Sequence, residues 1–191
     1  SVPEESRAVQ PSHYGFIDYL RTPESNRAGV DLRLASSARK GADGRIYSLL
    51  KDARTGKSSY LSPQDIADKT LAFPGEMDSG KKYVKALQKG KIKFVARGDV
   101  DYAVPEVEHV LNQLSNLIPG KSGVKGQREV MGSRMLAQAL PLVNAEAPLV
   151  QSKVPGEDTS YEEQYGKLMG AVHADQWGRV LSVSPDEIRV K

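Results

Sequence analysis

The 191-residue sequence contains no cysteine, which excludes disulfide bridges and metal sites built on thiolates. It has no apolar run near the ~20 residues that a membrane-spanning helix requires, so no membrane partner is expected. Its polar, acidic start does not resemble a signal peptide. Aromatic residues make up only 6% of the chain, so a core has to rest on aliphatic residues and methionine. The lack of cysteine fits a reducing compartment, and we predict a cytoplasmic location.

Motifs for a self-contained active site are also absent from the sequence. His13, His109 and His173 are far apart and show no metal-ligand spacing, so each is expected to be structural. No GxSxG elbow activates a serine. Gly-Lys-Ser occurs at residues 56–58 and 120–122, but both copies lack the earlier glycine of a phosphate-binding P-loop. We therefore predict no catalytic residue and no metal ligand within this chain.

The charge is informative through its distribution, because a formal net charge of +3 identifies no partner. Residues 79–98 contain seven basic side chains and no acid: Lys81, Lys82, Lys85, Lys89, Lys91, Lys93 and Arg97. Such a cluster can contact phosphate, or it can be a solvated lysine face. Charge alone favours the solvated face.

The hydrophobic patterning predicts an α+β chain that is rich in short strands. Residues 105–118 carry apolar side chains at helical spacing, and a second helix is predicted over residues 127–139. Ser62 followed by Pro63 predicts the start of a short helix. Strands are predicted at residues 45–50, 91–97, 171–173, 179–183 and 187–190.

Residues 119–128 form the most suggestive stretch. Three glycines allow close backbone approach to a ligand, while Lys121, Lys125 and Arg128 supply positive charge just before the predicted helix. A helix start also favours anions. Contact with nucleotide or nucleic-acid phosphates and a merely flexible basic loop remain equally supported by these residues.

Several segments, taken together, resemble the β subunit of bacterial multisubunit RNA polymerase. Residues 10–15 and 21–24 (QPSHYG and RTPE) resemble the family's HPTHYG and ETPEG motifs. Residues 116–119 (NLIP), then 127–132 (QREVMG) with Met135, Gln138 and Pro141, resemble SLIPF and NRALMGANMQRQAVP. Residues 147–150 (APLV) resemble KPLVGTG. All of these occur in the family's order and at compatible spacing.

This resemblance implies a composite architecture and a set of contacts. Residues 1–35 would end a fork-like region, residues 36–104 would form an external β-rich domain, and residues 105–191 would begin the hybrid-binding region. The resemblance places nucleotide or RNA contacts at Arg128, Gln138, Glu24 and Arg134, of which Arg134 replaces the family's asparagine. Electrostatic contacts with phosphate are expected at Lys121, Lys125 and Arg7.

The resemblance also implies partners. The expected partners are a β′-like subunit, the remaining β segments, template DNA, nascent RNA and nucleoside triphosphates. Mg²⁺ would be held by the partner subunit and not by this chain. Because the family's subunit is several times longer, the chain is expected to be an excised fragment or a split subunit. The divergence suggests a bacteriophage source, with possible location in a virion.

Two other functions stay open at the level of sequence. One is a non-catalytic regulator, a β-like module that binds a host polymerase or DNA. The other is a plain nucleic-acid-binding domain that uses the lysines between residues 81 and 97, in which case binding would weaken steeply with salt.

Overall fold

The computed structural model describes residues 2–8, 10–140, 142–174 and 176–191, so Pro141 lies outside the described residues. The strands are β1 (Ile17–Asp18), β2 (Arg33–Leu34), β3 (Arg39–Lys40), β4 (Ile46–Asp52), β5 (Ser58–Leu61), β6 (Leu71–Ala72), β7 (Tyr83–Gln88), β8 (Lys91–Ala96), β9 (Tyr102–Ala103), β10 (Val180–Val183) and β11 (Ile188–Val190). The α-helices are α1 (Pro63–Ile66), α2 (Gln113–Asn116), α3 (Gly126–Ala137) and α4 (Tyr161–Leu168). Short 3₁₀ helices cover Glu4–Arg7, Pro11–His13, Arg97–Asp99, Val107–Val110 and Lys121–Gly123. Within these ranges no helix has the length and apolarity to cross a bilayer.

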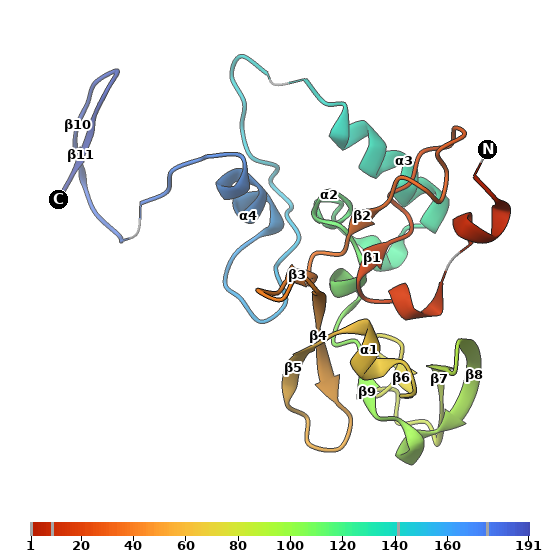
Figure 1. The fold of residues 1–191 in the computed structure, drawn as a ribbon. Coiled ribbons are helices and arrows are strands. Elements are labelled where there is room, and N and C mark those ends of the chain that lie inside the picture. Colours follow the sequence, from red (N-terminus) through yellow and green to blue (C-terminus); the bar gives the residue numbers. More distant parts are fainter. Residues whose placement is uncertain (1, 9, 141, 175) are drawn as a thin grey trace.

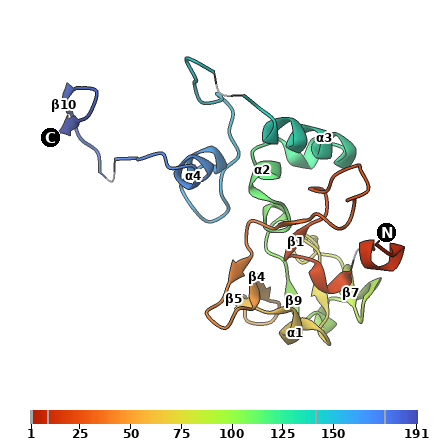
Figure 2. The same ribbon diagram turned by 45° about the horizontal axis from the view of Figure 1, so that its top comes forward.

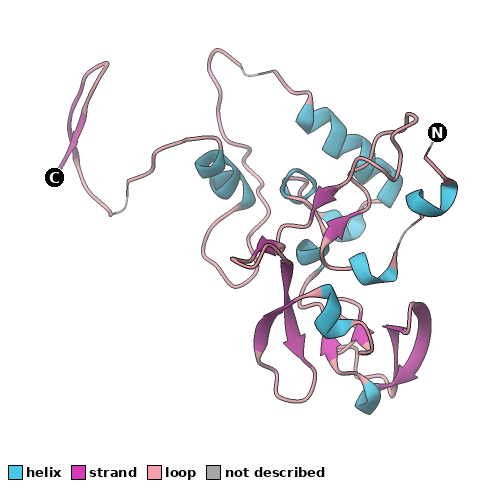
Figure 3. Ribbon diagram, in the orientation of Figure 1, coloured by secondary structure: helices cyan, strands magenta, loops and turns pink. Residues whose placement is uncertain are grey.

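Seven strands form one sheet in the order β3-β4-β9-β6-β7-β8, with β5 paired to β4 (Figure 3). All neighbours are antiparallel except β6 and β9, which run parallel. β1 pairs with β2, and β10 pairs with β11, in two separate hairpin-like sheets. The predicted α+β, β-rich class is confirmed.

The predictions made from local patterns hold best. Strands predicted at residues 45–50 and 91–97 are β4 and β8, and the last two predicted strands are β10 and β11. The short helix after Ser62 is α1, which begins with a reciprocal capping box between Ser62 and Asp65. The helix predicted at residues 127–139 is α3.

Two predicted elements are wrong, and among the helices α4 was missed. The single helix predicted over residues 105–118 is interrupted, because Leu111 is extended and the Asn112 side chain caps α2 as a new helix start. Residues 171–173 form no strand. The missed helix is α4, although Ser160 accepts a hydrogen bond from the Glu163 amide as a normal N-cap.

Apolar packing is concentrated around the sheet. One cluster fills the β6, β7, β8 and β9 side with Ala72, Val84, Ala86, Val95, Val100 and Ala103. A second joins Phe16, Leu50, Ile66, Leu71 and Val104, so the N-terminal segment packs onto the sheet beside α1. Figure 1 shows the β10–β11 hairpin apart from this body, and all seven of its strand residues are exposed.

A buried carboxylate connects the N-terminal segment to the helices. Asp18 is fully buried, and its oxygens accept hydrogen bonds from the Leu20 amide at 2.8 Å, the Asn112 amide at 2.7 Å and the Ser115 hydroxyl at 2.8 Å. The Ser115 oxygen also lies 3.4 Å from the Ser133 hydroxyl on α3, and because the single O–H of Ser115 is used on Asp18, Ser133 is the donor of this pair. A buried carboxylate is tolerated when its lone pairs are used in this way.

We therefore expect Asp18→Asn to lower the free energy of unfolding by about 2–3 kcal/mol, because the amide NH₂ has to face an N–H or O–H donor in place of an acceptor. Equilibrium denaturation in urea would measure the change. Asp158→Asn is the matched control, since this exposed carboxylate only accepts from Lys153, and its effect should stay within about 0.5 kcal/mol. Equal effects of the two substitutions would contradict the prediction.

Candidate functional site

The loop of residues 22–29 is held in place by Arg7. The Arg7 guanidinium donates to the carbonyl oxygens of Asn26 at 2.5 Å and Ala28 at 3.0 Å. Gly29 closes the loop by donating its amide to the Thr22 hydroxyl at 2.8 Å. A side chain at Gly29 is excluded, because its φ is +73° and a Cβ would lie 2.5 Å from the Arg7 carbonyl oxygen. Arg7, predicted as a phosphate contact, thus has backbone partners within the chain.

The same loop is attached to α3 through Arg134. The Arg134 guanidinium donates to the Thr22 carbonyl at 2.6 Å and forms an ion pair with Glu24 at 2.6 Å. The loop lies beside α3 in both Figure 1 and Figure 2. The sequence predicted Glu24 and Arg134 as site residues separately, and the structure brings them into direct contact.

A cavity of about 200 Å³ lies where the loop meets the end of α3. Its lining contains three arginines, one acid and the Gln138 side chain: Arg21, Thr22, Pro23, Asp31, Arg33, Arg134 and Gln138. Asp31 is paired with Arg33. The buried Nε atoms of Arg21 and Arg134 have no hydrogen-bond partner among the described residues. The excess of guanidinium groups makes this cavity suited to an anion.

Arg128 and Gln138 mark the two ends of one exposed stripe on α3. Arg128, Met131, Met135 and Gln138 follow one another at helical spacings of three and four residues, and all four are exposed. By helix geometry the two ends lie about 80° apart around the axis and about 15 Å apart along it. Arg128 itself makes only a weak contact with the Met131 sulfur at 3.9 Å, and it does not line the cavity at Gln138.

The two lysines predicted before α3 have different environments. Lys125 is exposed at the N-cap of α3, as a phosphate contact requires. Lys121 is buried: its ammonium lies 3.6 Å from the Glu108 carboxylate and 5.6 Å from the Tyr161 ring centroid. It also donates to the Asn116 carbonyl and the Ser152 hydroxyl, both at 3.3 Å. Lys121 was predicted to contact phosphate, but its buried ammonium instead connects α2 to residues 152–161 within the chain.

Glu129 is a buried acid that the sequence reasoning missed. It is 6% exposed on the inner side of α3, and its Oε1 atom has no hydrogen-bond partner among the described residues. It lines a largely apolar cavity of about 370 Å³ together with Lys121 and Asp18. Burial raises the pKa of the Glu129 carboxyl, and the Lys121 ammonium only partly offsets this effect.

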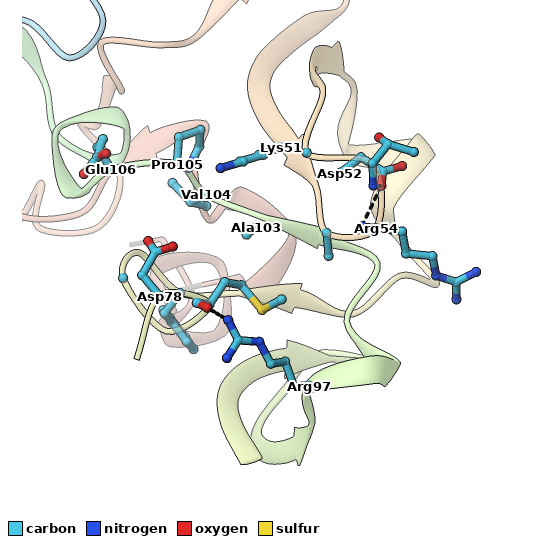
Figure 4. A pocket seen from close by; sticks show the side chains of 15 residues that line it. Lys51, Asp52, Arg54, Asp78, Arg97, Ala103, Val104, Pro105 and Glu106 are labelled. Carbon is cyan, nitrogen blue, oxygen red and sulfur yellow. Dashed lines mark hydrogen bonds between the residues drawn. The ribbon is translucent and has the colours of Figure 1, made fainter. Parts of the chain in front are cut away.

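A further cavity, of about 420 Å³, does not include the predicted site residues. It lies between Lys51, Arg54, Asp78, Arg97 and Glu106, with equal numbers of acids and bases in its lining (Figure 4). The Asp52 carboxylate is used by the amides of Arg54 and Thr55. In the part of the chain that the structure describes, no group of three or more histidines or acids is arranged to hold a metal ion.

Comparison with known proteins identifies the class to which this fold segment belongs. The family "RNA polymerase Rpb2, domain 3" matches residues 3–39, which include the Arg7 contact, β1 and the 22–29 loop. Three curated bacterial relatives are each named DNA-directed RNA polymerase subunit beta. They come from Rhizorhabdus wittichii (32% identical over 98% of this chain), Gloeobacter violaceus (31% over 97%) and Thermosynechococcus vestitus (30% over 97%).

The chain therefore belongs to the bacterial-type β-subunit family of DNA-directed RNA polymerases. It spans 13–17% of the length of these three relatives. The resemblance found in the sequence motifs is confirmed by similarity over nearly the whole chain.

The buried state of Glu129 leads to a pH-dependent prediction. A folded-state pKa above the unfolded value means that the native state holds the proton more tightly, so Glu129 should favour folding at low pH. This contribution should be lost as pH rises from the ordinary carboxyl pKa of about 4.3 through the raised folded value. We expect Glu129→Gln to be more stable than the parent chain at neutral pH, with the difference shrinking on acidification.

Urea denaturation of parent and variant at a series of pH values would measure this difference directly. Glu146→Gln, at an exposed position, is the control and should show no pH-dependent difference from the parent chain. A Glu129→Gln difference that grows on acidification would show that the sign is wrong.

Proposed function

We propose that this segment helps to position nascent RNA and the incoming nucleotide in template-directed transcription by an assembled RNA polymerase. The observation that carries the proposal is the exposed stripe on α3, which holds Arg128 at one end and Gln138 at the other. Membership of the β-subunit family supports it, and the alternative of a non-catalytic regulator is not favoured by relatives that are all named as β subunits.

The chemistry of the stripe fits this role. A guanidinium near a helix start can hold two phosphate oxygens at once, and among the described residues Arg128 has no ion-pair partner that would compete for it. An amide such as that of Gln138 both donates and accepts, which suits a sugar hydroxyl or a base edge. The arginine-lined cavity beside Gln138 adds attraction for a phosphate group there. These side chains would act by positioning and electrostatics, not by bond-making.

The proposal requires partners. Mg²⁺ would be held by a β′-like subunit, and this chain would supply no metal ligand and no activity alone. Template DNA, nascent RNA and nucleoside triphosphates are the proposed ligands of the assembly. The remaining β segments are proposed to cover exposed apolar residues such as Trp177, Leu181 and Val183, which an isolated chain leaves in water.

The positions within the subunit are part of the same proposal. Residues 1–35 would end the fork-like region, residues 36–104 would form the external domain, and residues 105–191 would begin the hybrid-binding region. Two features support this division. All seven strands of the large sheet lie between residues 39 and 103, and α3 follows that sheet in the chain.

The proposal predicts the effect of Arg128→Ala in a polymerase assembled with this segment. We expect the nucleotide concentration for half-maximal elongation to rise at least about tenfold, since a charge-assisted pair contributes ~1.5–3 kcal/mol. Elongation rates on a primed scaffold across a nucleotide titration would measure it.

Arg45→Ala is the matched control. Arg45 is an exposed arginine at the turn before β4, where it lies near Asp43, and its loss should leave the nucleotide requirement unchanged. An Arg128→Ala enzyme with the parent nucleotide dependence would rule out the proposed role of Arg128.

A further inference from the structure

The β7–β8 hairpin exposes large apolar side chains on one face. The register pairs Lys85 with Phe94 and Leu87 with Ile92, so these residues share the outer face with Tyr83, although Leu87 is half-buried there against the second core cluster. Phe94 is 75% exposed, Ile92 59% and Tyr83 56%. The opposite face is conventional, because Val84, Ala86 and Val95 pack into the core. Single exposed apolar residues are normal, but three on one hairpin face indicate a binding surface.

This face lies within the strongest run of positive charge in the chain. Residues 79–98 contain seven basic residues and no acid. The Lys82 ammonium lies 5.9 Å from the Tyr83 ring centroid, and Lys85 lies directly opposite Phe94 across the hairpin. Glu76 is an acid at the border, where its carboxylate accepts the Lys85 backbone amide at 3.0 Å. Apart from Arg97, which donates to the Met77 carbonyl, the basic residues of this run are exposed.

The hairpin is built to hold these side chains at the edge of the sheet. β8 ends the strand order, so it has a neighbour on one side only. The two-residue turn at Lys89 and Gly90 has positive φ at both positions, +47° and +72°, which matches the twist of a tight hairpin. Figure 1 shows β7 and β8 at the lower right edge of the molecule, far from α3 at the top.

We infer that the outer face of the β7–β8 hairpin, defined by Tyr83, Lys85, Ile92 and Phe94, binds single-stranded nucleic acid. Exposed rings offer stacking surfaces to unpaired bases, and the surrounding lysines complement the phosphate backbone. Tyr83 on β7 and Phe94 on β8 are diagonal neighbours, and sheet geometry places the Cα atoms of such neighbours about 7–8 Å apart. A duplex, whose bases are already stacked, would use the lysines but not the rings. This surface is separate from the α3 site and does not depend on the function proposed there.

The test uses the 191-residue chain and a fluorescein-labelled oligothymidylate, followed by fluorescence anisotropy. Phe94→Leu keeps an apolar side chain but removes the ring, and it should weaken binding about fivefold or more. Phe94→Trp should retain the parent affinity, because it retains a stacking surface. Circular dichroism of each variant would establish that the fold is unchanged.

Tyr60→Leu is the matched control, since Tyr60 is an exposed aromatic residue on β5 of the same sheet. This variant should bind the oligonucleotide with the affinity of the parent chain. Lys85→Gln should make the slope of log affinity against log salt shallower by about the amount that one phosphate contact contributes, whereas Lys57→Gln should leave this slope unchanged. Equal losses for Phe94→Leu and Tyr60→Leu, or no loss for either, would overturn the inference. So would a polyglutamate peptide that binds as tightly as the oligonucleotide and depends equally on Phe94, which would indicate an acidic protein partner.

Discussion

The buried carboxylate of Asp18 is the interaction on which the arrangement of the two halves depends. Its oxygens accept hydrogen bonds from the Leu20 amide just after β1 and from Asn112 and Ser115 at the start of α2, of which Asn112 lies 94 residues further along the chain. The hydroxyl of Ser115 also contacts the hydroxyl of Ser133, which links this network to α3. Since the 22–29 loop begins four residues after Asp18, this carboxylate also sets where the loop meets α3. An unpaired charge in this place would destabilise the fold, so the three donors and the carboxylate are needed together.

A second polar tie organises the chain after α2. Apolar core residues lie mostly between Phe16 and Leu111, and beyond that point the buried apolar side chains in the described part are Val154 and Tyr161. Lys121 connects them to the body through Glu108, Asn116 and Ser152. The residues after α2 are thus held to the rest of the chain mainly by polar contacts, and the β10–β11 hairpin that follows them is wholly exposed.

Sequence reasoning predicted the elements whose signals are local and failed where distant residues decide. The alternation that predicted β8 and the Ser62 cap that predicted α1 are signals contained within a few neighbouring residues, and both elements are present. The single helix predicted over residues 105–118 is wrong although the apolar spacing in that segment is helical. The Asn112 backbone amide donates to the distant Asp18 carboxylate, and Asn112 caps a new helix start there. The prediction of a phosphate contact at Lys121 fails for the same reason, since the Tyr161 ring that its ammonium contacts lies 40 residues further along the chain. Arg128 and Gln138 were expected from the family resemblance of their segment, whereas the cavity at Arg21 and Arg33 could not be foreseen, because it requires the folded loop.

The 22–29 loop is held in place mainly through its backbone. Arg7 and Arg134 bind carbonyl oxygens of the loop, and Thr22 accepts from a backbone amide. Contacts with the backbone do not depend on which side chains the loop carries, so substitutions at residues 25–28 are compatible with the loop's position. Gly29 is the exception, because the Arg7 carbonyl leaves no room for a Cβ. These backbone contacts therefore fix the loop, and with it the positions of Thr22 and Pro23 in the lining of the arginine-lined cavity.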